Sequence, residues 1–132
     1  MNKLNQSPAA LVAGFAYILG TVLFTVYGQI VLKWRVAKAG ALPAAFSQKI
    51  FFLVSMIWDP WVMSSIVAGF FAFLCWMAAL TEFELSYAYP FMSLSFLLVL
   101  VFSAILFQEP LTVSKIVGVG LIVAGIIIGS RG

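Results

Sequence analysis

The sequence contains no histidine, a single cysteine and very few charged residues. The absence of histidine removes the commonest metal ligand and the commonest general base. Cys75 has no partner for an internal disulfide, and the ordinary role of such a residue is that of a small buried hydrophobe. Glycine-rich phosphate loops, paired cysteine motifs and nucleophile elbows are also missing. We therefore expect no enzyme activity, no catalytic residue, no metal and no cofactor.

Charged residues make up 8% of the chain and hydrophobic residues 64%, whereas a soluble domain is about 25% charged. A water-soluble fold of this composition would expose large hydrophobic patches, so the expected solvent is a lipid bilayer. The net charge is +3, but the basic residues are few and clustered. We therefore expect no nucleic-acid partner.

Carboxylates are missing from the interior of every long apolar segment. All four acidic residues lie at segment ends or between segments: Asp59, Glu82, Glu84 and Glu109. This pattern removes the simplest intramembrane site for proton coupling or for binding an organic cation. The polar side chains inside the segments that draw attention instead are Gln29, Lys33, Tyr89, Ser93 and Ser95.

Four segments are apolar and long enough to cross a membrane, because a helix needs roughly 20 apolar residues to cross a hydrocarbon core. Inside lipid such spans must be helical, since the backbone finds no water to bond. The sequence predicts an all-α membrane protein with one four-span transmembrane domain over residues 1–132. The predicted spans are about 9–33, 60–81, 86–108 and 112–130.

A short interfacial helix is expected before the second span, at about 45–58. A single helix that continued from this stretch through the second span would be roughly 52 Å long, which is too long for a bilayer without strong tilt. Asp59-Pro60 breaks it, because aspartate caps helices well and proline is favoured at the first helical position.

The basic residues are unevenly divided between the two sides of the predicted membrane domain. The side of the first connection carries Lys33, Arg35, Lys38, Lys49 and Lys115, and the other side carries Lys3 and Arg131. The positive-inside rule then predicts that both termini lie outside the cytoplasm.

Two short stretches hold the candidate binding residues. Gln29 and Lys33 are four residues apart on the first span and share a helix face. Lys33 is either a snorkelling anchor at the helix end or a cation that holds an anionic head group. In the third span Pro90 removes a backbone donor, and Tyr89 and Ser93 fall on one face. This stretch is more typical of a polar cavity lining than of an interfacial belt.

The fourth span carries glycines at helical spacing, with Gly118, Gly125 and Gly129 on one face. Small residues at this spacing let two helix backbones approach closely. They serve either packing within one subunit or dimerisation. Because four helices can hardly enclose a polar path and also shield it from lipid, we expect a second four-helix subunit, in a homodimer or a heterodimer.

At these residues the chain resembles the small four-helix members of the drug/metabolite transporter superfamily, a group that includes EamA-like and small multidrug resistance-like proteins. The likeness is greatest to the paired flippase subunits for undecaprenyl-phosphate-linked aminoarabinose, and it covers residues 9–33 and about 60–130. The motifs that carry it are Tyr27-Gly28-Gln29-x-x-x-Lys33, Ala88-Tyr89-Pro90-x-x-Ser93-Leu94-Ser95-Phe96, Glu109-Pro110 and the glycines of the apolar tail.

The resemblance implies a subunit of a transporter in the bacterial inner membrane that flips a polyprenyl-phosphate-linked sugar. Its first three spans would line the substrate path, and its fourth would pair with a partner subunit. By similarity, the candidate substrate contacts are Gln29, Lys33, Tyr89, Ser93 and Glu109. The candidate dimerisation residues are Gly118, Gly125 and Gly129, and surrounding membrane lipid is the remaining expected partner.

Related small multidrug resistance proteins carry a membrane-embedded glutamate eight residues before the lysine, where this sequence has Thr25. Threonine does not titrate, which argues against proton-coupled export by that mechanism. Two alternatives stay open. One is a small multidrug or cation exporter that uses Glu82 or Glu84, and the other is a non-transporting assembly subunit that binds a larger membrane enzyme through the glycine face.

Overall fold

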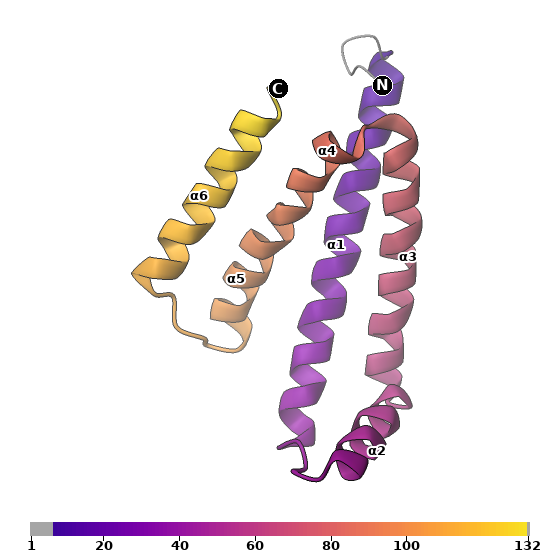
Figure 1. The fold of residues 1–132 in the computed structure, drawn as a ribbon, viewed down its shortest axis with the longest axis vertical. Coiled ribbons are helices and arrows are strands. Elements are labelled where there is room, and N and C mark those ends of the chain that lie inside the picture. Colours follow the sequence, from indigo (N-terminus) through magenta and orange to yellow (C-terminus); the bar gives the residue numbers. More distant parts are fainter. Residues whose placement is uncertain (1–6, 132) are drawn as a thin grey trace.

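The computed structural model describes residues 7–131, which form helices and no strand (Figure 1). Lys3, which entered the predicted charge balance, lies outside the described residues. The elements are α1 (Pro8–Ala39), α2 (Phe46–Ile57), α3 (Pro60–Glu82), α4 (Leu85–Ala88), the 3₁₀ helix η2 (Tyr89–Ser93), α5 (Leu94–Leu106) and α6 (Val113–Gly129).

Three helical stretches of the described chain are long and apolar enough to cross a membrane. They are α1, α3 and the stretch Leu85–Leu106, which joins α4, η2 and α5. The fourth predicted span corresponds to α6, an apolar helix of 17 residues. The chain is thus an all-helical, multi-pass membrane protein.

The first helix begins as expected and ends later than the predicted span. The Ser7 hydroxyl accepts a hydrogen bond of 3.1 Å from the backbone N–H of Ala10, and Pro8 takes the first helical position. The helix continues past its apolar segment to Ala39, because lysine, arginine and alanine are good helix formers. Gly40 ends it with φ of 92°, a conformation that favours glycine.

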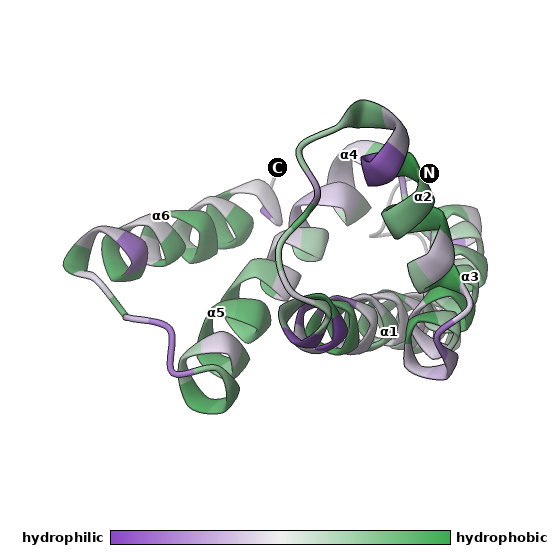
Figure 2. Ribbon diagram, turned by 90° about the horizontal axis from the view of Figure 1, so that it is seen from below, coloured by the Kyte–Doolittle hydropathy of each residue, from purple (hydrophilic) through white to green (hydrophobic). Residues whose placement is uncertain are grey.

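The break at Asp59-Pro60 is confirmed, since Asp59 caps α3 and separates it from α2. None of the residues of α2 is buried, and its apolar side chains face outward, as Phe46 and Phe51 illustrate. Figure 2 looks onto the end of the molecule that carries α2 and shows mostly apolar helices. Hydrophilic residues there mark the end of α1 and the connection between α5 and α6.

Pro90 loosens the start of the third predicted span, as its missing N–H requires. The chain forms one turn of α-helix in α4, tightens into η2 over Tyr89–Ser93, and returns to α-helix in α5. The helix ends at Leu106, two residues before the predicted end at residue 108. Gln108 has φ of 53°, and this left-handed backbone redirects the chain toward α6.

Helices α1 and α3 lie side by side along their length, and the core lies between them at the end near α4 (Figure 1). The buried core consists of Ile18, Val22, Val26, Ala79, Phe83 and Ala88. Gly28 permits the close approach of the two helices farther along, because a Cβ at this position would lie 3.3 Å from the Ser65 carbonyl oxygen.

Toward the opposite end the packing opens. Helix α5 has no buried residue, and α6 has only Ile126. In Figure 1, α6 stands at one edge, and both labelled ends of the chain lie at the end of the molecule opposite to α2. The five basic residues that the sequence analysis assigned to one side of the membrane domain therefore gather at the α2 end.

Candidate functional site

A cavity of about 410 Å³ lies between α1, α3 and the η2–α5 stretch; we call it the α5 cavity. It brings together the predicted residues Tyr89 and Ser93 with Thr25 of the first helix. Its lining consists of Thr21, Thr25, Gly69, Ala72, Phe73, Trp76, Tyr89, Met92, Ser93, Ser95 and Phe96. Tyr89 and Ser93, which the sequence spacing placed on one helical face, both belong to this lining.

A second cavity, of about 530 Å³, lies between α1, α2 and α3; we call it the α2 cavity. It contains Gln29, the predicted amide on the first span. Three residues line both cavities, namely Thr25, Gly69 and Ala72. The two cavities therefore adjoin across a wall made of small side chains.

The polar groups of the α5 cavity fall into two sets. The hydroxyls of Thr21 and Ser95 donate hydrogen bonds to carbonyls of their own helix, at 2.8 Å to Tyr17 and 2.7 Å to Met92. Within residues 7–131, the structure gives no side-chain hydrogen-bond partner to Tyr89 or Ser93. Their hydroxyl groups are available to a ligand.

The side chains of Gln29 and Thr25, like the hydroxyls of Tyr89 and Ser93, have no hydrogen-bond partner in the described chain. An amide offers two donors and an acceptor, and a hydroxyl offers one donor and two acceptor lone pairs. Neither cavity has a carboxylate among its lining residues in the described part of the chain. The interior can thus form hydrogen bonds with a polar group but holds no acid that would attract a cation.

Lys33 lies outside the linings of both cavities and faces Glu109, the predicted residue after α5. The Lys33 Nζ and Glu109 Oε1 atoms are 3.8 Å apart, and the side chains are 56% and 39% exposed. The sequence proposed both residues as substrate contacts but did not predict that they form an ion pair. A run of 76 positions separates them in the chain, so no local signal reports their contact.

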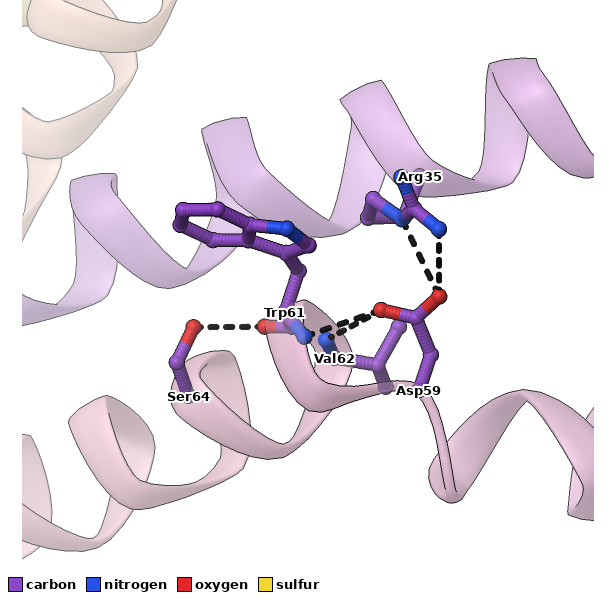
Figure 3. Close-up of polar contacts among 5 residues, drawn as sticks. All are labelled: Arg35, Asp59, Trp61, Val62 and Ser64. Carbon is purple, nitrogen blue, oxygen red and sulfur yellow. Dashed lines mark hydrogen bonds and ion pairs between the residues drawn. The ribbon is translucent and has the colours of Figure 1, made fainter.

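A second ion pair joins the end of α1 to the start of α3 (Figure 3). Arg35 donates two hydrogen bonds to Asp59 Oδ2, at 3.1 Å from Nε and 2.5 Å from Nη2. Asp59 Oδ1 accepts from the backbone N–H groups of Trp61 and Val62, at 2.9 and 3.4 Å. Both oxygens of this carboxylate thus accept hydrogen bonds from the protein, as expected of a structural pair.

The hydrogen bond from Arg35 lowers the pKa of Asp59 below its ordinary value, and the two backbone N–H groups and the charge of Arg35 act in the same direction. Nearby, the Trp34 and Trp61 rings meet edge to face with centroids 5.3 Å apart. The Lys38 ammonium lies 4.6 Å from the Trp34 ring centroid. The sequence predicted Asp59 as a cap but not Arg35 as its partner.

The predicted dimerisation glycines of α6 have open space beside them in the described chain, and Gly125 and Gly129 are exposed. A Cβ built on Gly118, Gly125 or Gly129 meets no atom of the described residues within 4 Å. Packing against another helix of the same subunit is therefore not what keeps these positions small. The glycine face, as we call these three residues, remains open in a single subunit.

Comparison with known proteins gives a consistent set of relatives. Residues 4–131 match the EamA-like transporter family. A Pseudomonas fluorescens protein named "Probable 4-amino-4-deoxy-L-arabinose-phosphoundecaprenol flippase subunit ArnF" is 34% identical, over 89% of this chain and 88% of that protein. An Erwinia tasmaniensis protein of the same name is 36% identical over 87% and 92% of the two chains.

A Pseudomonas aeruginosa protein named "Probable 4-amino-4-deoxy-L-arabinose-phosphoundecaprenol flippase subunit ArnE" is 31% identical over 88% of this chain and 96% of that protein. No solved structure matches the chain. The similarity extends over nearly the whole length of each relative.

Proposed function

Because this chain belongs to the EamA-like transporter family, we propose that it is a four-span subunit of a bacterial inner-membrane flippase for a polyprenyl-phosphate-linked sugar. The observation that carries the proposal is the near full-length similarity to proteins named as flippase subunits for such a lipid. In this proposal α6 is the fourth span. Its 17 residues give about 26 Å, close to the hydrocarbon thickness of a bilayer.

The two adjoining cavities form one side of the path for the polar head group. Gln29, Tyr89 and Ser93 donate and accept hydrogen bonds from this side, and Lys33 contacts the phosphate at the α2 end. A buried anion without a partner costs far more than one that is paired, so a path for phosphate needs such a cation. The polyprenyl tail remains in lipid throughout.

A second four-helix subunit completes the path. Cavities that open on one side of a single subunit expose the head group to lipid unless another protein surface covers them. The glycine face has no neighbour among the described residues and suits close contact with a partner helix. The relatives named ArnE and ArnF favour a pair of similar subunits, although the chain itself is compatible with a homodimer or a heterodimer.

The α2 end lies at the cytoplasmic side in this proposal, because the basic residues of the first connection gather there. Lys33 and Glu109 then meet the head group as it enters from the cytoplasm. Both termini lie on the far side.

The test is delivery of the lipid-linked sugar in cells that depend on this chain. Replacement of Gln29 and Lys33 by alanine should reduce delivery by about tenfold or more, which corresponds to the loss of one charge-assisted hydrogen bond. Lys49→Ala, which removes a basic residue of the same end outside both cavities, is the control and should leave delivery unchanged. Undiminished delivery by the Gln29 and Lys33 variants at normal expression would remove the proposed phosphate site.

A further inference from the structure

We propose that Lys33 and Glu109 together recognise a head group that carries both charges, with Lys33 holding the phosphate and Glu109 holding an ammonium group of the sugar. The inference rests on the proposed function, and an amino sugar is part of the lipid that the relatives' names give. It assigns to Glu109 a role in selecting the amine.

The geometry of the Lys33–Glu109 pair is that of two charges held near each other without a tight bond. The 3.8 Å between Nζ and Oε1 is longer than a direct hydrogen bond, and both side chains are partly exposed. The Arg35–Asp59 pair at the same end contrasts with it, since it has two hydrogen bonds and two further backbone donors. The Arg35–Asp59 pair is therefore the harder one for a ligand to break, and the Lys33–Glu109 pair is the one that can exchange its partners for those of a ligand.

Exchange costs little at this position. A partly exposed ion pair contributes about 0–1 kcal/mol. A ligand with both charges replaces it by two pairs, phosphate with lysine and ammonium with carboxylate. An anionic ligand without an amine replaces it by one pair and leaves Glu109 beside the phosphate, where like charges repel.

The backbone holds Glu109 in place while its side chain remains available. Its N–H donates to the Ser103 carbonyl at 3.3 Å, and the next carbonyl, that of Pro110, accepts from the Lys115 ammonium at 3.0 Å. The preceding residue, Gln108, has a left-handed backbone with φ of 53°, which sets the direction in which Glu109 leaves the helix. The backbone of Glu109 is therefore held in place at the α2 end, where the head group enters the proposed path, and only the side chain needs to move.

Lys33 lies on α1 between Glu109 and the residues that line the cavities. It follows Gln29 by four residues and Thr25 by eight, so the three side chains form one stripe along α1. Thr25 lines both cavities and Gln29 lines the α2 cavity. A head group bound between Lys33 and Glu109 is one helical turn from the first hydrogen-bonding group of the interior.

An amine of this kind is charged under physiological conditions. An alkylammonium group such as that of lysine titrates near pH 10. The oxygens of a sugar ring make its amine less basic than this, but the amine still carries a proton in most molecules at neutral pH. Acetylation of the amine removes the charge and leaves the phosphate and the tail unchanged. The acetylated lipid is therefore the matched probe for the role of Glu109.

The experiment measures movement of two lipids in vesicles that contain the chain in the assembly it forms in the membrane. One lipid is undecaprenyl phosphate linked to 4-amino-4-deoxy-L-arabinose, and the other is its N-acetylated form. The wild type should move the amine about 10- to 100-fold faster than the acetylated form, as expected for a charge-assisted hydrogen bond. Glu109→Gln should abolish this preference, mainly by slowing movement of the amine.

A charge-swapped double variant, Lys33→Glu with Glu109→Lys, separates recognition from a structural ion pair. A purely structural pair would be restored by the swap, and so would transport. If the pair recognises the substrate, transport by the double variant should stay lost. The tail fixes the position of the phosphate, so the phosphate would meet a carboxylate at position 33 instead of a lysine. Lys49→Gln is the control, and the melting temperature of each variant in detergent reports that it is folded.

Equal rates for the two lipids in the wild type, or recovery of amine transport in the charge-swapped variant, would overturn the inference while leaving the proposed function intact. Failure of the wild-type assembly to move either lipid would overturn the proposed function and this inference with it.

Discussion

Thr25 stands in the wall shared by the two cavities, one helical turn from Gln29. A glutamate at this point would put a titrating carboxylate into a largely apolar space and attract cations. Threonine provides a hydroxyl instead, which bonds to polar groups but carries no charge. The interior thus offers hydrogen bonds without a charge, and in the proposed function the charges of the ligand are bound outside it, by Lys33 and Glu109.

Asp59 is the residue whose removal should change stability in a pH-dependent way. Its folded-state pKa lies below the ordinary value of 3.8, first because of the hydrogen bond from Arg35. The carboxylate therefore stabilises the fold above pH 3.8, and this contribution is lost as the pH falls through the lower, folded-state pKa. Asp59→Asn keeps a good cap but loses the ion pair, so its melting temperature in detergent should fall at neutral pH.

The difference between the wild type and Asp59→Asn should shrink as the pH is lowered through and below 3.8. Glu109→Gln is the matched control, because Glu109 belongs to the longer and more exposed ion pair and should change the melting temperature less. Equal melting temperatures for the wild type and Asp59→Asn at neutral pH would show that the Arg35 contact contributes nothing.

The helices themselves were largely predictable, because their ends depend on local chemistry. Ser7 and Asp59 cap the helices that they precede, and Pro90 produces the 3₁₀ turn, since each effect acts within four residues. Helix α1 extends beyond the predicted span 9–33, because apolar composition marks where lipid is needed and not where a helix stops. Gly40, with its positive φ, is the residue that ends it.

Contacts between distant elements were not predictable from the sequence. The Arg35–Asp59 and Lys33–Glu109 pairs join residues that are far apart in the chain, and many alternative pairings of these charges satisfy the same pattern. The wall around Thr25 depends equally on which faces of α1 and α3 meet. The sequence indicated which side chains are polar and intramembrane, and the packing decided which of them share a cavity.

The contact between α1 and α3 at Gly28 should tolerate no large side chain. A Cβ there already lies 3.3 Å from the Ser65 carbonyl oxygen, which belongs to a helix backbone and cannot rotate away. Gly28→Leu should therefore destabilise the fold by about 1–3 kcal/mol, as overpacking does, and lower the melting temperature in detergent. Gly120→Leu is the control, since a Cβ there meets nothing within 4 Å. Equal melting temperatures for the two variants would contradict the close approach of α1 and α3.

The molecule as a whole has a largely apolar surface beside its two cavities. Large apolar side chains face outward over most of its surface, with Phe51 and Ile128 as examples, and the cavities lie at the side of α1 and α3 that faces α2 and α5. We expect lipid to cover most of a surface of this kind. The glycine face of α6 differs from it, because it offers backbone rather than side chains to a neighbour.

Assembly should depend on that face. Gly125→Leu would place a bulky side chain where we expect a partner helix to approach closely, and it should reduce recovery of the two-subunit assembly in cross-linking by about tenfold, since small-residue contacts carry much of helix association in membranes. Gly120→Leu, on the other side of the same helix, should leave assembly unchanged. Normal assembly of the Gly125→Leu variant would place the partner elsewhere.

The most direct measurement is movement of the lipid-linked amino sugar across vesicles that contain the purified assembly of this chain. We predict that the intact assembly moves undecaprenyl-phosphate-linked aminoarabinose between the leaflets faster than protein-free vesicles do, and that the Gly125→Leu subunit, whose pairing should be reduced about tenfold, moves it correspondingly more slowly. Movement no faster than in protein-free vesicles, with the assembly folded and inserted, would contradict the account.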